Sequence, residues 1–324
     1  MSKWEIPPKG GHMDLADGIY FQNMTTKEVE ERLKKCDLII LPIGSTENHG
    51  PHACYGEDTF LVTRIAETVA KKTGCTIAQP LWYGSHPFHH LGMPGTIPID
   101  ENIFTAYISQ MIAGFWNAGF RKQIILNGHG QEYVLPTAIH RFAKKYQVPG
   151  IFINLNWYYA IPQFMKDKAH GGPFETPFIH ADEAETSVGR LFFPDMVDMS
   201  KTEEAETEML MPGGHMDTSV DSYGRPSRWS ECEGHAAIEI AGTPEGVVGK
   251  PGLGEANKAK KPVLAIMEYL TLLIDETLEA FPAGTVPPTE KVSLRDPKEL
   301  APYLKEPMSK GWKSVYSLPQ VGQF

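Results

Sequence analysis

The amino-acid sequence predicts an α/β fold, in which a mainly parallel sheet is sandwiched by helices and followed by an irregular C-terminal arm. Short apolar runs alternate with amphipathic segments through the first half of the 324-residue chain, and such alternation is typical of a parallel sheet covered on both faces. The apolar runs stop at glycine and polar residues, as expected where buried strands end. The residues from 283 onward are rich in proline and lack a regular period, which favours an arm lying on the protein surface.

Capping residues and apolar spacing predict the first elements. A helix is expected after Thr25, because Thr25 and Glu28 form a capping-box pattern. The continuous apolar run LIILPIG at 38–44 predicts a fully buried strand. A second helix is predicted over 58–74, where apolar residues fall four apart and Gly74 stands at the position of a C-cap.

The alternation continues beyond residue 74. The expected elements are a strand at 76–84, a helix at 103–118, a strand at 123–128, a helix at 135–146, a strand at 151–157 and an amphipathic helix at 262–280. Parallel strands of this kind, joined by right-handed crossovers, bind ligands at their carboxyl ends. We expect loops, with a hairpin or two, over 200–254. Residues 1–282 are predicted to form a single domain, and 283–324 an extension that packs on the body or on a neighbouring subunit.

Composition argues against some classes of function. The formal net charge is −10 and no dense run of lysine and arginine occurs, which disfavours a nucleic-acid partner. No stretch approaches the roughly 18 consecutive apolar residues that a membrane span needs, and the first residues lack the apolar core of a signal peptide. The four cysteines form no CxxC pair, so neither a disulfide framework nor a zinc ribbon is indicated. We therefore expect a cytoplasmic protein that acts on a small molecule.

The segment GSTENHGPHACYGEDT, residues 44–59, carries several possible metal ligands directly after the first predicted strand. Carboxylate and imidazole groups are the ligands that zinc, manganese and iron(II) take in proteins. Glu47 and His49 are two apart on an extended stretch, so both side chains can point into one crevice. Asp58 begins a helix and can turn its carboxylate back toward them. Asp58 could instead be a helix N-cap, but the position of the loop at the ligand-binding edge favours a metal site.

Two further segments lie at the same predicted edge. In NGHGQE, residues 127–132, His129 stands between two glycines that let the backbone approach a ligand closely, and we expect it to be a fourth ligand. In HADEAET, residues 180–186, His180 precedes a helix that carries Glu185. This pair suits proton transfer, although an acidic residue in the first turn of a helix is often only a partner of the helix dipole.

Together these segments resemble the creatininase (creatinine amidohydrolase) family over about residues 36–280. The family pattern is E-x-H-G-x-H, then D eleven residues after the E, then N-G-H, then H-A-x-x-x-E-T/S. The chain matches it at 47–52, Asp58, 127–129 and 180–186. The resemblance implies a three-layer α/β fold and a compact homo-oligomer, commonly a hexamer.

The resemblance also implies a centre of two divalent metals, zinc, manganese or iron. Glu47 and His129 would hold one metal, His49 the other, and Asp58 would bridge them, while His180 and Glu185 would match the residues assigned to proton transfer. Gln131 departs from creatininase, which has at that place a glutamate that ligates the second metal. That metal could then be held by Glu185, by Gln131 through its amide oxygen, or only weakly.

Such a centre predicts a metal-dependent hydrolase in which a metal-bound hydroxide attacks a carbonyl of a small cyclic substrate. The first expectation is ring-opening amide hydrolysis of a creatinine-like ring. The alternative is carbon–carbon hydrolysis of a cyclic polyhydroxy ketone in inositol catabolism. A non-catalytic small-molecule-binding protein is the third possibility, since it would also use loops at a sheet edge. The absence of a GxGxxG motif disfavours a dinucleotide site, and the absence of a G-x-S-x-G motif disfavours a serine hydrolase. The residues expected to bind substrate are His52, His90, Gln131 and Trp157.

Overall fold

The computed structural model describes residues 18–161, 167–176, 178–206 and 243–320. In this part of the chain the sheet has four parallel strands in the order β2-β1-β3-β4. The strands are β1 (Leu38–Ile43), β2 (Thr76–Ile77), β3 (Lys122–Asn127) and β4 (Ile151–Asn156). β1 and β3 are paired along their whole length from Leu38↔Lys122 to Ile43↔Asn127, so both end at the same edge.

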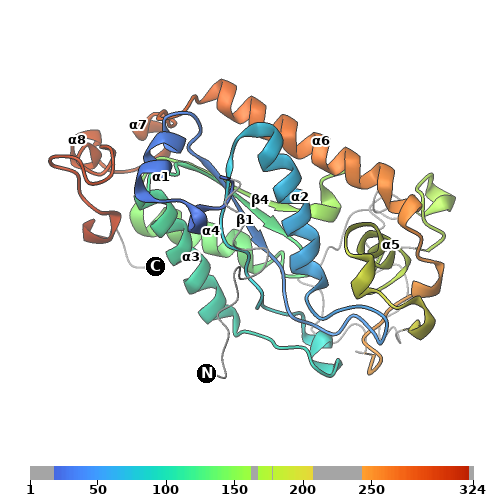
Figure 1. Cartoon of the computed structure of the whole chain (residues 1–324). Coiled ribbons are helices and arrows are strands. Elements are labelled where there is room, and N and C mark those ends of the chain that lie inside the picture. The colour runs from blue at the N-terminus through green and yellow to red at the C-terminus, as the bar shows by residue number, and fades with distance from the viewer. Residues whose placement is uncertain (1–17, 162–166, 177, 207–242, 321–324) are drawn as a thin grey trace, which may run out of the picture.

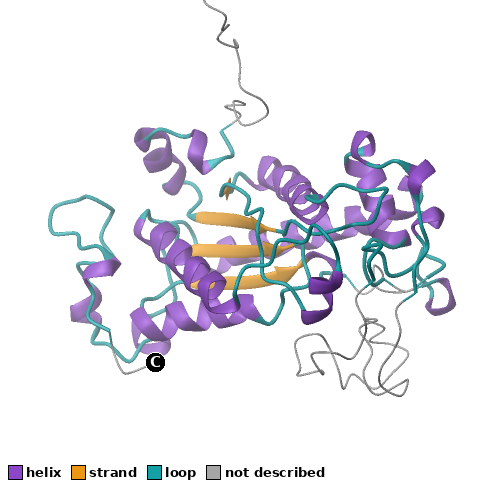
Figure 2. Ribbon diagram, turned by 90° about the horizontal axis from the view of Figure 1, so that it is seen from below, coloured by secondary structure: helices purple, strands orange, loops and turns teal. Residues whose placement is uncertain are grey.

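Helices cover both faces of the sheet (Figures 1 and 2). The α-helices of the described residues are α1 (Thr26–Leu33), α2 (Glu57–Thr73), α3 (Glu101–Asn117), α4 (Val134–Tyr146), α5 (Glu183–Phe192), α6 (Ala256–Ala280), α7 (Thr289–Val292) and α8 (Pro297–Leu300). Because side chains alternate along a strand, Leu38 and Ile40 pack with α2, α5 and α6, whereas Ile39 and Leu41 pack with α3 and α4. The predicted α/β sandwich is confirmed.

Local signals also hold at several helix ends. Thr25 caps α1 in a full capping box with Glu28, and Gly74 ends α2 with a left-handed φ of 75°. The strand expected over 76–84 is wrong in its length, because β2 stops at Ile77 and only an isolated bridge, Ile43↔Leu81, follows. Pro80 has no N–H to donate to a ladder, so the chain runs beside β1 without a continuous strand.

The C-terminal arm packs against the body of the same chain. Leu300, Tyr303 and Val315 are buried within the layer formed by α3 and α4, and Arg121 donates a hydrogen bond to the Tyr303 carbonyl at 3.2 Å. A domain boundary at residue 282 stays a prediction.

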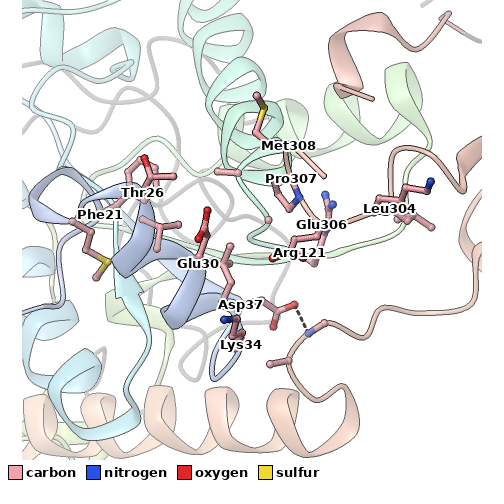
Figure 3. Close-up of a pocket in the computed structure, with 18 of the residues that line it drawn as sticks. Phe21, Thr26, Glu30, Lys34, Asp37, Arg121, Leu304, Glu306, Pro307 and Met308 are labelled. Carbon is pink, nitrogen blue, oxygen red and sulfur yellow. Dashed lines mark hydrogen bonds between the residues drawn. The ribbon is translucent and has the colours of Figure 1, made fainter. Parts of the chain in front are cut away.

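A pocket lies between α1, the turn after α3 and the arm (Figure 3). Asp37, which precedes β1, and Arg121, which precedes β3, line it, and Asp37 accepts a hydrogen bond there from the Gly284 N–H at 3.3 Å. The pocket is therefore at the amino ends of the strands, opposite the edge where the predicted ligands lie.

Loops dominate the described parts of 200–254, with two isolated bridges, His180↔Val248 and Ala205↔Gly249. Residues 207–242, which include most of the region where hairpins were expected, lie outside the described residues. Among the described helices, none combines the length and the apolar character that crossing a membrane requires.

Candidate metal centre

The carboxyl ends of the strands bring together eight buried acidic and imidazole side chains from distant parts of the sequence. They come from the loop after β1, the first turn of α2, the loop at 84–92, the turn after β3, and the segment that begins α5. The eight residues are Glu47, His49, Asp58, His86, His90, His129, His180 and Glu185. The six residues predicted from the sequence to form the centre are therefore gathered at one edge of the sheet.

Close backbone contacts make this gathering possible. A Cβ built at Gly128 would lie 2.5 Å from the Asp58 carbonyl oxygen, so the turn after β3 rests directly on the first turn of α2. Gly246 has a φ of 70° and packs against the side chain of Asn48. A Cβ built at Gly246 would lie 2.2 Å from the nearest Asn48 atom. Glycine at these two positions lets loops from three parts of the chain meet.

Glu47 is the centre of the cluster. Five imidazole nitrogens lie around its carboxylate, at 2.8 Å (His90 Nδ1), 3.1 Å (His129 Nδ1), 3.3 Å (His86 Nδ1), 3.6 Å (His49 Nε2) and 3.6 Å (His180 Nδ1). Burial alone would raise the pKa of Glu47, but the surrounding histidines, His129 and His90 foremost, hold it well below its ordinary value. The carboxylate is thus kept ionised inside the protein.

Asp58 lies between two of these histidines. Its Oδ1 is 3.3 Å from His49 Nε2, its Oδ2 is 3.1 Å from His129 Nδ1, and Ser45 donates a hydrogen bond to Oδ2 at 2.7 Å. Burial and the charge of Glu47 would raise the pKa of Asp58, but the two histidines lower it to about 2. The N-cap of α2 is Gly56 rather than Asp58, which leaves the Asp58 carboxylate directed at the cluster.

His180 is held by a backbone carbonyl. Its Nε2 donates to the Asn48 carbonyl at 2.8 Å, and its Nδ1 faces the Glu185 Oε2 at 4.0 Å. Burial lowers the pKa of His180 to about 3, so its neutral ring carries the proton on Nε2 and a lone pair on Nδ1. The ring is therefore oriented by the Asn48 carbonyl, and at 4.0 Å Glu185 is too far from Nδ1 for a hydrogen bond.

Glu185 is fixed by the turn that begins α5. The Ala181 N–H donates to its Oε2 at 2.6 Å, and Ala181 adopts a left-handed φ of 47°. Such a conformation is unfavourable for a residue with a side chain and is found most often at functional sites. The turn places Glu185 Oε2 3.9 Å from His49 Nε2.

The cluster fits a cation. Several of its buried atoms have no hydrogen-bond partner, among them Glu47 Oε2, His49 Nε2 and His129 Nε2, and buried polar atoms without partners are costly. Three groups of side chains have ligand atoms within 4.8 Å of one another: Glu47, His86, His90 and His129; Glu47, His49 and His180; and His49, Asp58 and Glu185. Nitrogen and oxygen ligands in this mixture suit zinc, manganese or iron.

The other predicted substrate-binding residues lie differently. Gln131 joins three segments: its Nε2 donates to the Gly44 carbonyl and to Asn127 Oδ1, and its Oε1 accepts from the Ser85 N–H. Its amide is thus already engaged within the protein. His52 hydrogen-bonds Thr186 Oγ1 at 2.9 Å.

Trp157 is fully buried and packs in the core against Tyr158 and Phe178. The structure shows no open face on it, and its role in substrate binding stays a prediction.

His86 was not predicted from the sequence. It stands in the segment GSHPFHH, residues 84–90, which follows a segment expected to be a strand and is itself rich in histidine. That combination is the same signal that marked the loop after β1, and it could have drawn attention to His86 as well as to His90.

Comparisons with known proteins identify relatives of the chain in sequence and in structure. A model of the creatinine amidohydrolase (creatininase) family matches residues 22–274. The 3-dehydro-scyllo-inosose hydrolase of Thermotoga maritima is 54% identical over 305 residues, which cover 94% of this chain and 98% of that protein. A manganese form of creatininase aligns with a TM-score of 0.63 at 21% identity, covering 82% of this chain and 99% of that chain. A zinc–zinc form of a creatininase variant aligns with the same TM-score and identity, covering 81% of this chain and 98% of that chain.

Proposed function

The chain belongs to the creatinine amidohydrolase (creatininase) family of metal-dependent hydrolases, and we propose that it opens a cyclic polyhydroxy ketone by hydrolysing a carbon–carbon bond of the ring. The observation that carries this proposal is the 54% sequence identity to an inosose hydrolase over nearly the full length of both chains. The non-catalytic alternative loses its support, because the family consists of hydrolases.

The reaction is balanced for a ring that carries two ketones flanking one carbon. Water adds its oxygen to one carbonyl carbon, and the bond from that carbon to the flanked carbon breaks. The attacked carbon becomes a carboxylate, while the electron pair remains on the flanked carbon, where the second ketone stabilises it. That carbon then takes a proton, so the product is an open-chain keto acid.

We propose a centre of two divalent ions held by Glu47, Asp58 and His129 on one side and by His49, Asp58 and Glu185 on the other. Support comes from the distances around Asp58, whose two oxygens face His49 and His129 separately. When bound, such ions supply a nucleophile at neutral pH and polarise the carbonyl group of the substrate. Glu185 would replace the glutamate that creatininase has at the position of Gln131, since the amide of Gln131 is engaged elsewhere.

His180 would move the proton. With Nε2 donating to the Asn48 carbonyl, its Nδ1 is the atom that can take a proton from the attacking water and return it to the carbon that leaves. Asn48 keeps the ring in this tautomer.

Ring-opening hydrolysis of a creatinine-like cyclic amide is the second candidate, because the family model that matches the chain is that of creatinine amidohydrolase. In that reaction the leaving atom is nitrogen, and the same proton from His180 would go to it.

A substrate assay of the zinc-, manganese- or iron-loaded protein separates the two. We expect hydrolysis of 3-dehydro-scyllo-inosose and little turnover of creatinine and other cyclic amides. Turnover of the amides alone would reject the ketone proposal. Asp58→Ala should abolish the activity, because it removes the carboxylate that faces both metal positions, and activity that survives the change would contradict the bridging role.

We also propose that the protein is a cytoplasmic homo-oligomer, a hexamer as is common in the family. The support is a set of exposed apolar side chains along α6, at Leu264, Tyr269 and Leu272, and thiols at Cys36, Cys54 and Cys75 that form no disulfide. Light scattering on purified protein would measure the subunit count, and a monomer at micromolar concentration would contradict the assembly.

A further inference from the structure

The two carboxylate oxygens of Glu47 face different groups of histidines. Oε1 lies toward His49, His129 and His180, whereas Oε2 lies 3.3 Å from His86 Nδ1 and 2.8 Å from His90 Nδ1. The ligand set proposed above for this ion is Glu47, Asp58 and His129. It includes no residue of the loop at 84–92, which Glu47 Oε2 faces.

His86 is the unexplained residue on that side. Its side chain is fully buried, and neither Nδ1 nor Nε2 has a hydrogen-bond partner. An imidazole in such a place costs free energy unless something binds it. Its ring lies 4.4 Å from that of His129, centroid to centroid, so the unpartnered nitrogens are next to a residue already expected to be a ligand.

The spacing of these nitrogens suits one ion. Neighbouring ligands at the usual 2.0–2.1 Å from zinc are about 2.8 to 3.4 Å apart, from octahedral to tetrahedral geometry. Glu47 Oε2 lies 3.3 Å from His86 Nδ1 and 2.8 Å from His90 Nδ1, and Glu47 Oε1 lies 3.1 Å from His129 Nδ1. All four ligand atoms lie within 4.8 Å of one another and all four residues are buried.

We propose that His86 and His90 are metal ligands, and that with Glu47 and His129 they form a site of three imidazoles and one carboxylate. This inference rests on the metal-dependent function proposed above and revises its ligand set. Asp58 still faces both positions, with its Oδ2 3.1 Å from His129 Nδ1 and its Oδ1 3.3 Å from His49 Nε2, so its bridging role is kept. The second ion is held, besides Asp58, by His49 and Glu185. His180 is in neither group, which leaves its Nδ1 available for the proton.

Such a site also gives the loop at 84–92 a reason for its conformation. The segment that follows β2 is not a strand, and the short 3-10 helix at Phe88–Gly92 brings His90 to within 2.8 Å of Glu47. An ion held by His86 and His90 would tie this loop to the turn after β3.

The test is metal binding to the chelator-treated full-length protein. Cobalt(II) is titrated into the native protein, His86→Gln, His90→Gln and the control His140→Gln, whose histidine is exposed on α4. We expect affinity at one of the two sites to fall by more than ~100-fold in the first two variants, because loss of a mere supporting partner costs ~10- to 100-fold. The control should bind as the native protein does, and circular dichroism checks that each variant is folded.

A second readout separates a ligand from a neighbour. Each histidine bound to cobalt(II) through one nitrogen gives a strongly shifted proton signal from the other, so His86→Gln and His90→Gln should each lack one shifted signal. If the variants kept the shifted signals and the metal affinities of the native protein, the inference would be wrong, while the proposed function would stand. A raised KM with unchanged metal binding would lead to the same conclusion. A native protein that binds no transition metal would overturn the proposed function as well.

Discussion

At the scale of single residues, the position of His180 between Glu47, Glu185 and the Asn48 carbonyl defines what it can do. Its Nε2 is occupied, and its Nδ1 faces the two carboxylates at 3.6 and 4.0 Å. Both ring nitrogens are therefore assigned by geometry. A residue that only filled space here would not need the hydrogen bond that fixes its tautomer.

His180→Gln should lower kcat by ~10²- to 10⁴-fold, the usual contribution of a positioned proton-transfer group. Metal content should stay at the native level, because His180 is outside both proposed ligand groups. Steady-state kinetics and metal analysis on the same preparation measure the two effects. A variant that loses metal together with activity would show that His180 is a ligand instead.

Glu57 is a buried acid beside the cluster with no hydrogen bond to either oxygen. Its Oε1 faces α5, where a Cβ at Gly189 would lie 2.7 Å away. Burial raises its pKa to about 8 from the ordinary 4.5. The folded state therefore favours the protonated carboxyl group. The contribution of Glu57 to the free energy of unfolding is fully present below pH 4.5 and is lost as the pH rises through 8.

Glu57→Gln should remove this loss. In chelator-treated protein we expect the variant to be more stable than the native chain by a difference that grows from pH 5 to pH 8, reaching on the order of a few kcal/mol. Urea unfolding at a series of pH values gives the measurement. Glu268→Gln, at an exposed position on α6, should show no such trend, and a pH-independent difference for Glu57→Gln would contradict the burial argument.

At the scale of elements, the ends of β1 and β3 could be predicted because continuous apolar runs and their terminal glycines are local signals. The same holds for Glu47, His49, Asp58 and His129, which follow those runs directly. β2 and the loop at 84–92 could not be predicted in the same way. Pro80 interrupts the ladder there, and the approach of His86 and His90 to Glu47 depends on how a loop folds back, which no spacing in the sequence encodes.

The contact between α2 and the turn after β3 gives a prediction at this scale. Gly128→Ala places a Cβ 2.5 Å from the Asp58 carbonyl oxygen, and overpacking of this kind costs ~1 to 3 kcal/mol. Displacement of Asp58 should also weaken metal binding. Gly114→Ala, in α3 with ordinary contact to Tyr316 at 3.5 Å, should instead stabilise the protein by ~0.4 to 1 kcal/mol.

Denaturant midpoints and cobalt(II) titrations compare Gly128→Ala and Gly114→Ala with the native protein. If Gly128→Ala unfolded at the native midpoint and bound metal normally, the turn would have room to move, and the close contact would not be what positions Asp58.

At the scale of the whole molecule, the chain separates its metal cluster from its most irregular segment. The cluster lies at the carboxyl ends of the strands, near α5, and the arm with α7 and α8 lies at the other end of the molecule (Figure 1). Proline-rich composition predicted that the arm would be irregular, because proline limits helices and strands. It could not predict which of the arm's apolar residues are buried, since that depends on the surface that α3 and α4 present.

Leu300 tests whether the arm stabilises the fold without taking part in chemistry. Its side chain is fully buried in the layer of α3 and α4, so Leu300→Ala should lower the free energy of unfolding by ~2 to 5 kcal/mol. Leu294→Ala is the matched control in the same arm, because Leu294 is 90% exposed and its loss should change stability by less than ~0.5 kcal/mol. Urea unfolding measures both, and kcat at a temperature where both variants are folded should equal that of the native protein. Equal losses of stability in the two variants would contradict the packing of the arm, and a fall in kcat for Leu300→Ala alone would show that the arm reaches the metal cluster through the sheet.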